Sequence, residues 1–278
     1  MLNKILLDKY SEFLATLDIK IDGSRPWDIT VYNPDLYKSI LFNGSLGFGE
    51  SYMKGWFDCD RLDLFFEKIL RSGIYNEIGG APLFIGKMKS KLRNLQSISR
   101  AFQVAERHYD IGNDLFSLML DKTMMYTCGY WTKDVSTLEE SQLAKLDLVA
   151  KKLDLKPGMK VLDIGCGWGG AAKHFANNYG VTVVGITISK EQIEYAKQNS
   201  GNMDVEFRLM DYRDLDEKFD AIYSIGMFEA VGYKNYEEFF EVVRSCLKDE
   251  GAFLLHTIGG NESITTTDPW IEKYIFPN

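Results

Sequence analysis

The sequence is short of the features that mark secreted, metal-binding or membrane-spanning proteins. Its 278 residues include four cysteines and three histidines, and the cysteines have no C-x-x-C spacing. A disulfide framework and a zinc site are therefore disfavoured, and we expect a reducing, cytoplasmic compartment and no metal. No apolar run approaches the roughly 18 residues of a membrane span, and the N-terminus has no signal-peptide pattern.

Basic residues are also scarce, because 32 Lys and Arg stand against 40 Asp and Glu, which gives a net charge of −8. Proteins that bind nucleic acid need a surplus of positive charge, so we expect no nucleic-acid partner. The exception is local: residues 87–107 hold six basic residues and a single acid, Glu106. That stretch is either a solvated linker or a patch that meets lipid phosphates.

Apolar residues, in contrast, make up 45% of the chain, at a mean hydropathy of −0.19, so a sizeable core can form. A helical stripe over residues 1–17, a strand-like piece at 29–32 and a helix-like piece at 62–70 predict a small α+β domain. Glycines punctuate the stretch between the last two pieces. We place this domain at residues 1–85, a basic linker at 86–107 and a larger domain at 108–278.

Strands and helices alternate in the larger domain. A helix is predicted over residues 136–153, where Ser136 and Glu139 have capping-box spacing. Short apolar runs then predict five strands, at residues 161–164, 181–186, 205–209, 221–225 and 252–258. The alternation predicts an α/β fold, in which a parallel sheet carries helices on both faces.

The glycine-rich turn after the first of these strands predicts a cofactor site. Residues 160–170 read K-V-L-D-I-G-C-G-W-G-G, and glycines allow a ligand to approach the backbone closely. A dinucleotide site usually has an acid at the end of the second strand, but that strand ends in Thr187-Ile188-Ser189. The spacing of Asp163 to the glycines is instead typical of S-adenosylmethionine-dependent methyltransferases, with the carboxylate facing the cationic tail of the cofactor.

Polar side chains at two further strand ends extend this predicted pocket. Thr187 and Gln192 follow the second strand and could reach the ribose and the methionine end of the cofactor. Asp211 follows the third strand and could accept hydrogen bonds from an adenine amino group, with Tyr212 beside the ring. Because ligands bind at the carboxyl ends of strands in such sheets, the three positions predict one pocket.

Several motifs together resemble the cyclopropane-fatty-acyl-phospholipid synthases and the related mycolic acid cyclopropane synthases. They are G-E-S-Y-M-K-G-W at 49–56, R-H-Y-D-I-G-N-D-L-F at 107–116, Y-T-C-G-Y-W at 126–131, G-C-G-W-G-G at 165–170, M-F-E-A-V-G at 227–232 and L-L-H-T-I-G at 254–259. The likeness runs from about residue 15 to the last residue. It implies a Rossmann-like class I methyltransferase sheet behind a small lipid-binding N-terminal domain.

The resemblance also implies a reaction. A cis double bond of a phospholipid acyl chain attacks the methyl group of S-adenosylmethionine, and the resulting carbocation loses a proton to close a cyclopropane ring. The proton acceptor in this family is a bound bicarbonate ion. Its ligands match Cys128, Glu229, His256 and the backbone amide of Ile258. Taken alone, Cys128 and His256 could equally be buried structural residues.

The resemblance implies that Tyr126 and Thr127 touch the cofactor, and with the glycine turn and the strand ends they complete the predicted set. Its members are Tyr126, Thr127, Asp163, Gly165, Cys166, Gly167, Trp168, Thr187, Ile188, Ser189, Gln192, Asp211 and Tyr212. The resemblance further implies an unsaturated phospholipid as substrate, peripheral association with the inner face of the membrane, and a homodimer.

The sequence departs from the family pattern in two places. Ala230 stands where many relatives carry a histidine, and the chain ends at Asn278, where relatives continue. We therefore expect a sheet that is incomplete at its C-terminal end, without the final antiparallel pair. Two alternatives stay open: a methyltransferase that acts on another lipid or small molecule without ring closure, and a lipid-binding fragment without turnover.

Overall fold

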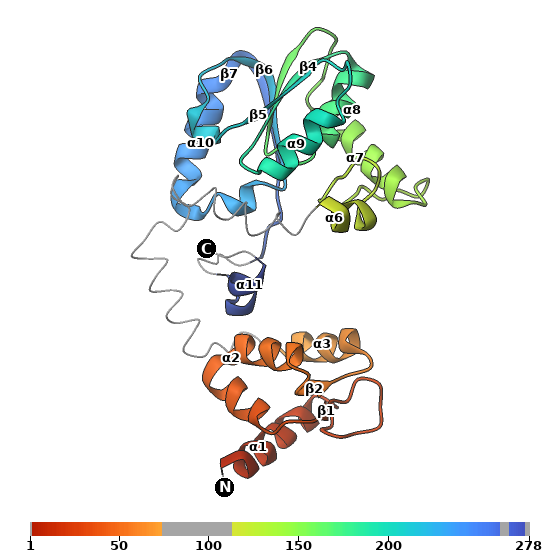
Figure 1. Ribbon diagram of the computed structural model, residues 1–278, viewed down its shortest axis with the longest axis vertical. Coiled ribbons are helices and arrows are strands. Elements are labelled where there is room, and N and C mark those ends of the chain that lie inside the picture. The colour runs from red at the N-terminus through yellow and green to blue at the C-terminus, as the bar shows by residue number, and fades with distance from the viewer. Residues whose placement is uncertain (1, 74–112, 262–266, 276–278) are drawn as a thin grey trace. The chain divides into compact units, whose positions relative to one another are not determined.

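The computed structural model describes residues 2–73, 113–261 and 267–275 (Figure 1). By its internal contacts the chain divides into two compact units. One comprises Met1–Arg93 with Ile264–Asn278, and the other comprises Asn94–Ser263. The boundaries predicted near residues 85 and 107 lie outside the described residues and stay a prediction, as does the basic linker between them.

The first unit combines helices with a two-stranded sheet. Its elements are α1 (Leu2–Thr16), β1 (Thr30–Val31), α2 (Asp35–Met53), β2 (Phe57–Asp58), α3 (Leu62–Arg71) and α11 (Pro269–Tyr274). Strands β1 and β2 pair antiparallel, and Phe57 and Phe65 are buried in the core between the helices. The helical stripe and the two short pieces expected from the sequence correspond to α1, β1 and α3.

Three glycines of this unit lie inside a helix. Helix α2 passes through Gly44, Gly47 and Gly49, with a bend at Gly44, where φ is 55°. A Cβ at Gly47 would lie 2.1 Å from the Ser39 carbonyl oxygen, and one at Gly49 would lie 2.4 Å from Trp270 Cδ1. Glycine is therefore required here by close packing, which a sequence pattern cannot distinguish from the glycines of a loop.

Helix α11 packs on α2 in this first unit, although the sequence analysis grouped its residues with the larger domain. Besides the Trp270 contact, Lys273 Nζ and the Tyr274 hydroxyl donate to Glu50 Oε1, at 2.5 and 3.0 Å. These bonds lower the pKa of Glu50 below its usual value. A charged and an aromatic contact thus join two segments more than 200 residues apart in sequence.

The second unit is built on a parallel sheet. Its elements are α6 (Asn113–Met119), α7 (Leu138–Lys152), β3 (Lys160–Ile164), α8 (Gly170–Tyr179), β4 (Thr182–Thr187), α9 (Lys190–Gln198), β5 (Val205–Leu209), β6 (Phe219–Ile225), α10 (Tyr236–Cys246) and β7 (Leu247–His256). The strand order is β5-β4-β3-β6-β7, and each neighbouring pair is parallel. In the register, Leu162 lies between Val184 and Ile222.

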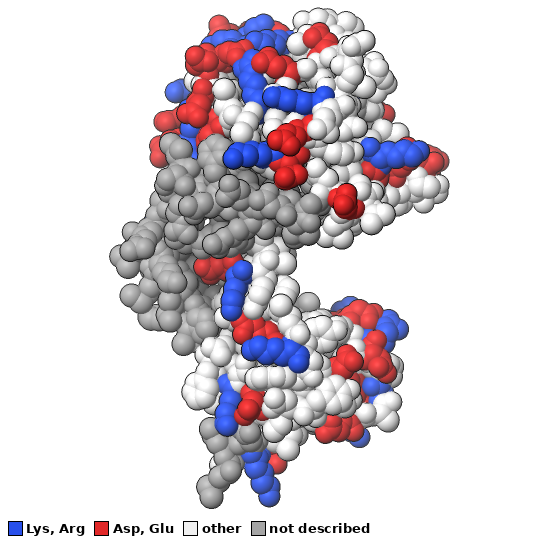
Figure 2. Space-filling view, in the orientation of Figure 1, with Lys and Arg blue, Asp and Glu red and all other residues white. Residues whose placement is uncertain are grey.

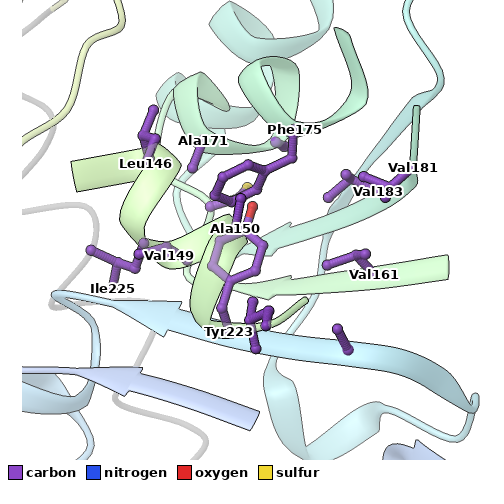
Figure 3. Close-up of a cluster of buried hydrophobic side chains, with 14 of the residues drawn as sticks. Leu146, Val149, Ala150, Val161, Ala171, Phe175, Val181, Val183, Tyr223 and Ile225 are labelled. Carbon is purple, nitrogen blue, oxygen red and sulfur yellow. The ribbon is translucent and has the colours of Figure 1, made fainter. Parts of the chain in front are cut away.

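Helices cover both faces of this sheet, as Figure 1 shows. Val161 and alternate strand residues pack under α7, α8 and α9 in one core cluster. Leu162 and Ile164 point the other way, toward the α10 cluster. Within the first cluster the rings of Phe175 and Tyr223 meet edge to face, with centroids 5.1 Å apart (Figure 3). The α/β class predicted from the alternation is confirmed.

Two local predictions need correction. The N-cap of α7 is Thr137, whose hydroxyl accepts from the Glu140 amide while the Glu140 carboxylate accepts from the Thr137 amide. The capping box is thus one residue later than the Ser136–Glu139 spacing suggested, and Ser136 also donates to Glu140. Strand β7 ends at His256, so Ile258 lies beyond the strand and is 81% exposed.

None of the helices in the described ranges combines the length and the apolar character needed to cross a bilayer.

Candidate functional site

The glycine-rich turn continues the sheet before it enters α8. The amides of Gly165 and Cys166 both donate to the Ile186 carbonyl, at 3.0 and 2.9 Å, so β3 stays tied to β4 as the chain turns. Gly165, Gly167 and Gly169 have φ values of 87°, 54° and 79°, which side chains rarely adopt. A Cβ at Gly167 would meet no atom within 4 Å. The backbone is therefore open to a ligand at this glycine.

Trp168 fixes this turn to helix α6. Its side chain is buried, its indole nitrogen donates to Asn113 Oδ1 at 2.7 Å, and its ring lies 4.7 Å from that of Phe116. Phe116 in turn meets Tyr126 edge to face, at 5.4 Å. This aromatic contact series brings Tyr126, a residue predicted to touch the cofactor, to the same end of the sheet as the turn.

At the end of β4 three predicted residues form one hydrogen-bonded group. The Thr187 hydroxyl donates to Gln192 Oε1 at 2.9 Å and accepts from the Ser189 amide at 3.2 Å. The Ser189 hydroxyl caps α9 by accepting from the Gln192 amide. All three residues are buried. Ile188, which lies between Thr187 and Ser189 in the sequence, is half-buried. The group leaves the Gln192 amide nitrogen as a donor beside the strand end.

Asp163 lies beneath the turn, in the core. Strand alternation places it on the same face as Val161, and its carboxylate accepts from the Tyr223 hydroxyl at 2.8 Å. Burial raises the pKa of Asp163 to about 7 despite the opposing effect of this bond. Burial also raises the pKa of the neighbouring Cys166 thiol. The predicted contact of Asp163 with a cationic cofactor tail stays a prediction.

Asp211 and Tyr212 follow β5 and have partners of their own. The Asp211 carboxylate is buried and forms an ion pair with Arg213, at 2.7 Å from Nη2 and 2.8 Å from Nε. Tyr212 meets Phe239 edge to face in the α10 cluster, and burial raises its pKa to about 12. An adenine that used Asp211 would therefore share it with Arg213.

Cys128 and His256 meet across the unit. Cys128 Sγ lies 3.6 Å from His256 Nε2, although the two residues are 128 positions apart. They line a cavity of about 190 Å³ together with Tyr130, Lys145 and Lys152. His256 Nδ1 is buried without a hydrogen-bond partner. An unpaired buried polar atom costs free energy, so this nitrogen is suited to a polar ligand.

Glu229 lies at the same edge of the sheet. It follows β6, and its Oε1 accepts from the Ile258 amide at 2.7 Å, two residues beyond His256. Because β6 and β7 are parallel neighbours, Ile225 is opposite His256 in the register. The four residues predicted to hold an anion are thus connected by two contacts, Cys128–His256 and Glu229–Ile258.

Three glycines hold the segment that carries Tyr126, Thr127 and Cys128. A Cβ at Gly170 would lie 1.9 Å from the Thr123 carbonyl oxygen, and one at Gly226 would lie 2.3 Å from Thr127 Cγ2. A Cβ at Gly129 would lie 2.1 Å from Ser141 Oγ. A Cβ at any of these positions would force its neighbour to move, so residues 123–129 pack closely on α8, on the end of β6 and on α7.

Lys145 and Gln142 on α7 were not predicted from the sequence. Both are buried, and Lys145 Nζ donates to Thr127 Oγ1 at 2.7 Å and to Gln142 Oε1. Gln142 Nε2 donates to the Thr127 carbonyl at 2.7 Å. The spacing of Gln142, Lys145 and Val149 places all three on one face of α7, and this spacing is the signal in the sequence that points to them. The motif residues 107–112 lie outside the described residues.

Comparison with known proteins assigns this architecture to a family. Residues 96–278 match the family model described as mycolic acid cyclopropane synthetase. The chain belongs to this family. It is 54% identical to the cyclopropane-fatty-acyl-phospholipid synthase of Escherichia coli strain K12, over 96% of this chain and 70% of that protein. The resemblance drawn from the motifs is confirmed.

Other family members cover less of the chain. The S-adenosylmethionine-dependent methyltransferase UmaA of Mycobacterium tuberculosis is 45% identical over 56% of each chain. The structure of the cyclopropane synthase MmaA2 from Mycobacterium tuberculosis aligns with a TM-score of 0.59 and 37% identity, over 63% of this chain and 68% of that one. The mycolic acid cyclopropane synthase CmaA1, solved with S-adenosylhomocysteine (SAH) and CTAB, aligns with a TM-score of 0.53 and 41% identity, over 55% of each.

The residues of this chain fit the cofactor and the anion that the family implies. The open backbone at Gly167 and the polar group of Thr187, Ser189 and Gln192 fit a nucleoside with an amino-acid tail. The unpaired His256 Nδ1 suits a small polar ligand, whereas the Ile258 amide already donates to Glu229 Oε1. Among the described residues no group of three or more His, Cys, Asp or Glu could hold a metal ion.

Proposed function

We propose that this family member transfers a methylene unit from S-adenosylmethionine to a cis double bond of an unsaturated phospholipid acyl chain, and so forms a cyclopropane ring. The similarity to the Escherichia coli synthase over nearly the whole chain supports the reaction. The observation that carries the proposal is the approach of Cys128 to His256 at the edge of the sheet where Glu229 meets Ile258.

The cofactor, when bound, supplies an electrophilic methyl group. Residues of the glycine turn and the Thr187 group hold it, and Tyr126 lies at the same sheet end with a half-exposed ring. Attack by the double bond leaves a carbocation on the acyl chain, which water would trap and an aromatic face stabilises. Tyr126, Tyr130 and Trp131 are exposed aromatic side chains of one short segment and can cover the chain.

Ring closure requires removal of one proton from the transferred carbon. A bicarbonate ion would supply the base for this step, and the His256 ring and Cys128 would hold it. The described structure has the Glu229 carboxylate on the Ile258 amide. Glu229 thus holds the segment after β7 in place and is positioned to receive a proton from the anion. Cys128 is exposed at the cavity, so it can contact an anion there.

We also propose peripheral association with the inner, cytoplasmic face of a membrane. Exposed apolar residues on α2 and α3 of the first unit support it; they are Leu41, Phe42, Tyr52, Met53, Phe66 and Leu70. On the face that Figure 2 shows, basic and acidic side chains are intermixed, so apolar contact is favoured over broad electrostatic attraction. A homodimer is implied by the family resemblance, and sedimentation velocity tests it.

The exchange of Glu229 for Gln tests the assignment. We expect Glu229→Gln to abolish SAH release and ring formation while S-adenosylmethionine binding, measured by calorimetry, changes less than about threefold, because Glu229 meets the Ile258 amide and not the turn. Glu241→Gln, on the exposed side of α10, is the matched control and keeps full turnover. The assay uses vesicles of cis-unsaturated phospholipid.

The products separate this function from its alternatives. Gas chromatography of the treated acyl chains distinguishes a cyclopropane from a methyl branch, and methyl-branched products would refute ring closure. Absence of sustained SAH release from the wild type would favour lipid binding without turnover. A large loss of cofactor affinity in Glu229→Gln would contradict the placement of Glu229 at the anion.

A further inference from the structure

A buried cation borders the cavity of Cys128 and His256. Lys145 is 4% exposed and lines the cavity from α7. A lysine is almost never buried to this degree without partners, and the described partners of Nζ are two neutral oxygens, Thr127 Oγ1 and Gln142 Oε1. Neither partner is a carboxylate, and Nζ forms no ion pair within the described part of the chain. Lys145 therefore lines the cavity with a charge that no acid contacts directly, and the Asp121 carboxylate acts on it only from a longer distance.

The bonds of Lys145 also determine where Cys128 lies. Nζ holds the Thr127 hydroxyl, while Gln142, which Lys145 contacts, holds the Thr127 carbonyl. Thr127 is thus fixed from both its side chain and its backbone, one residue before Cys128. A charge that is buried and held in this way acts through less water than a surface charge, so its field in the cavity is less screened.

We propose that Lys145 is a positioning residue that gives this cavity its affinity for a small carboxylate-like or carbonate-like anion, through its charge and through its hold on Thr127. The inference rests on the proposed function for the identity of the anion, and on the geometry alone for the charge. It predicts that an anion approaches Cys128 more readily than its neutral analogue does.

Burial supports the pH dependence that follows. It lowers the pKa of Lys145 to about 8, against smaller opposing effects from Cys128 and Asp121. The other groups that face the ammonium are Thr127 and Gln142, with His256 and Lys152 also on the cavity wall. The ammonium therefore predominates at pH 7, and its charge is lost as the pH rises through 8.

Alkylation of Cys128 measures the charge directly and needs neither cofactor nor lipid. Iodoacetate and iodoacetamide react alike, because the thiolate sulfur bonds to the methylene carbon and iodide leaves, but only iodoacetate is an anion. The measured quantity is the rate with iodoacetate divided by the rate with iodoacetamide at Cys128, read by peptide mass spectrometry. Changes in thiolate content and exposure affect both rates alike and so cancel in this ratio. Cys128 is exposed, while Cys59, Cys166 and Cys246 are buried and report by their lack of reaction that the protein is folded.

We expect Lys145→Met to lower this ratio roughly three- to tenfold at pH 7. The matched control is Lys152→Met, seven residues along the same helix on the same cavity, whose exposed charge is screened and whose loss changes the ratio much less. In the wild type the ratio falls toward that of the Met variant between pH 7 and pH 9. This last measurement requires no variant and decides the question should Lys145→Met fail to fold.

A ratio that is unchanged in Lys145→Met, or that falls equally in Lys152→Met, would overturn the proposal, and so would a flat wild-type ratio from pH 7 to pH 9. Turnover gives a second readout: Lys145→Met needs at least about tenfold more bicarbonate for half-maximal SAH release. If wild-type turnover does not respond to bicarbonate at all, the proposed base is refuted, and the alkylation ratio still decides the role of Lys145.

Discussion

The buried Asp163 makes a specific prediction for how stability depends on pH. Its pKa is about 7 in the folded protein, against 3.8 for the unperturbed side chain. Between these two values the unfolded chain has released the proton while the folded chain keeps it. Raising the pH across this window therefore favours unfolding, and the stabilisation that is present at low pH is lost by about pH 7.

The magnitude follows from the size of the shift. A difference of about three pKa units corresponds to about 4 kcal/mol over the whole window, of which about 3 kcal/mol falls between pH 5 and pH 8. Asp163→Asn has nearly the same shape and keeps an oxygen that accepts from the Tyr223 hydroxyl, but it has no proton to release. We expect the wild type to lose about 3 kcal/mol more than the variant between pH 5 and pH 8.

Urea unfolding followed by far-UV circular dichroism at pH 5, 6, 7 and 8 measures this difference. Asp216→Asn, an exposed carboxylate in the same unit, removes the same charge and serves as the control. Parallel curves for Asp163→Asn and the wild type would refute the reasoning, because they would mean that Asp163 is already ionised in the fold at pH 5. If Asp163 also contacts the cofactor tail, Asp163→Asn binds S-adenosylmethionine more weakly than the wild type does.

Two further predictions concern the segments around the site. Gly226→Ala forces a Cβ against Thr127 at a φ of 73°, so we expect a loss of about 1–2 kcal/mol of stability and weaker cofactor binding by calorimetry. Gly201→Ala, at a φ of 53° with no neighbour within 4 Å, has the backbone strain alone and should leave cofactor binding unchanged; equal binding losses would contradict the role of Thr127. Thr137→Ala removes the cap of α7 and should cost about 1 kcal/mol in urea unfolding, whereas Thr137→Ser keeps the acceptor and most of the stability; an equally large loss in Ser would argue against the capping bond.

The sheet was predictable from sequence because each central strand is a short apolar run between breaks. Strand β5 matches its predicted bounds, and the N-terminal ends of β3 and β4 differ from theirs by one residue. Strand β7 begins at Leu247, five residues before the prediction, because Lys248-Asp249-Glu250 has the composition of a turn. In the structure Leu247 pairs with Phe219 and Ala252 pairs with Ala221, and the polar stretch lies in the register shift between these two pairs.

The site was predictable in part. Glu229 follows β6 and His256 ends its parallel neighbour β7, so their common edge follows from topology, but no strand pattern locates Cys128. The approach of Cys128 to His256 depends on contacts of the segment 123–129 with distant glycines. This approach was expected only from the family resemblance. Lys145 could not be identified, because a lysine in an amphipathic helix is normally solvated. Its burial follows from the Thr127 contact, which the helix pattern does not contain.

The close packing of residues 123–129 on Gly170 and Gly226 has a consequence for experiments that divide the chain. The cysteine arrives early in translation, but the surfaces that hold it are completed only when β6 and β7 have joined the sheet. An N-terminal fragment that stops before β6 thus contains Cys128 but lacks Gly226 and His256, which contact this segment. When the chain is split between these elements, we expect activity to return only if the two fragments associate.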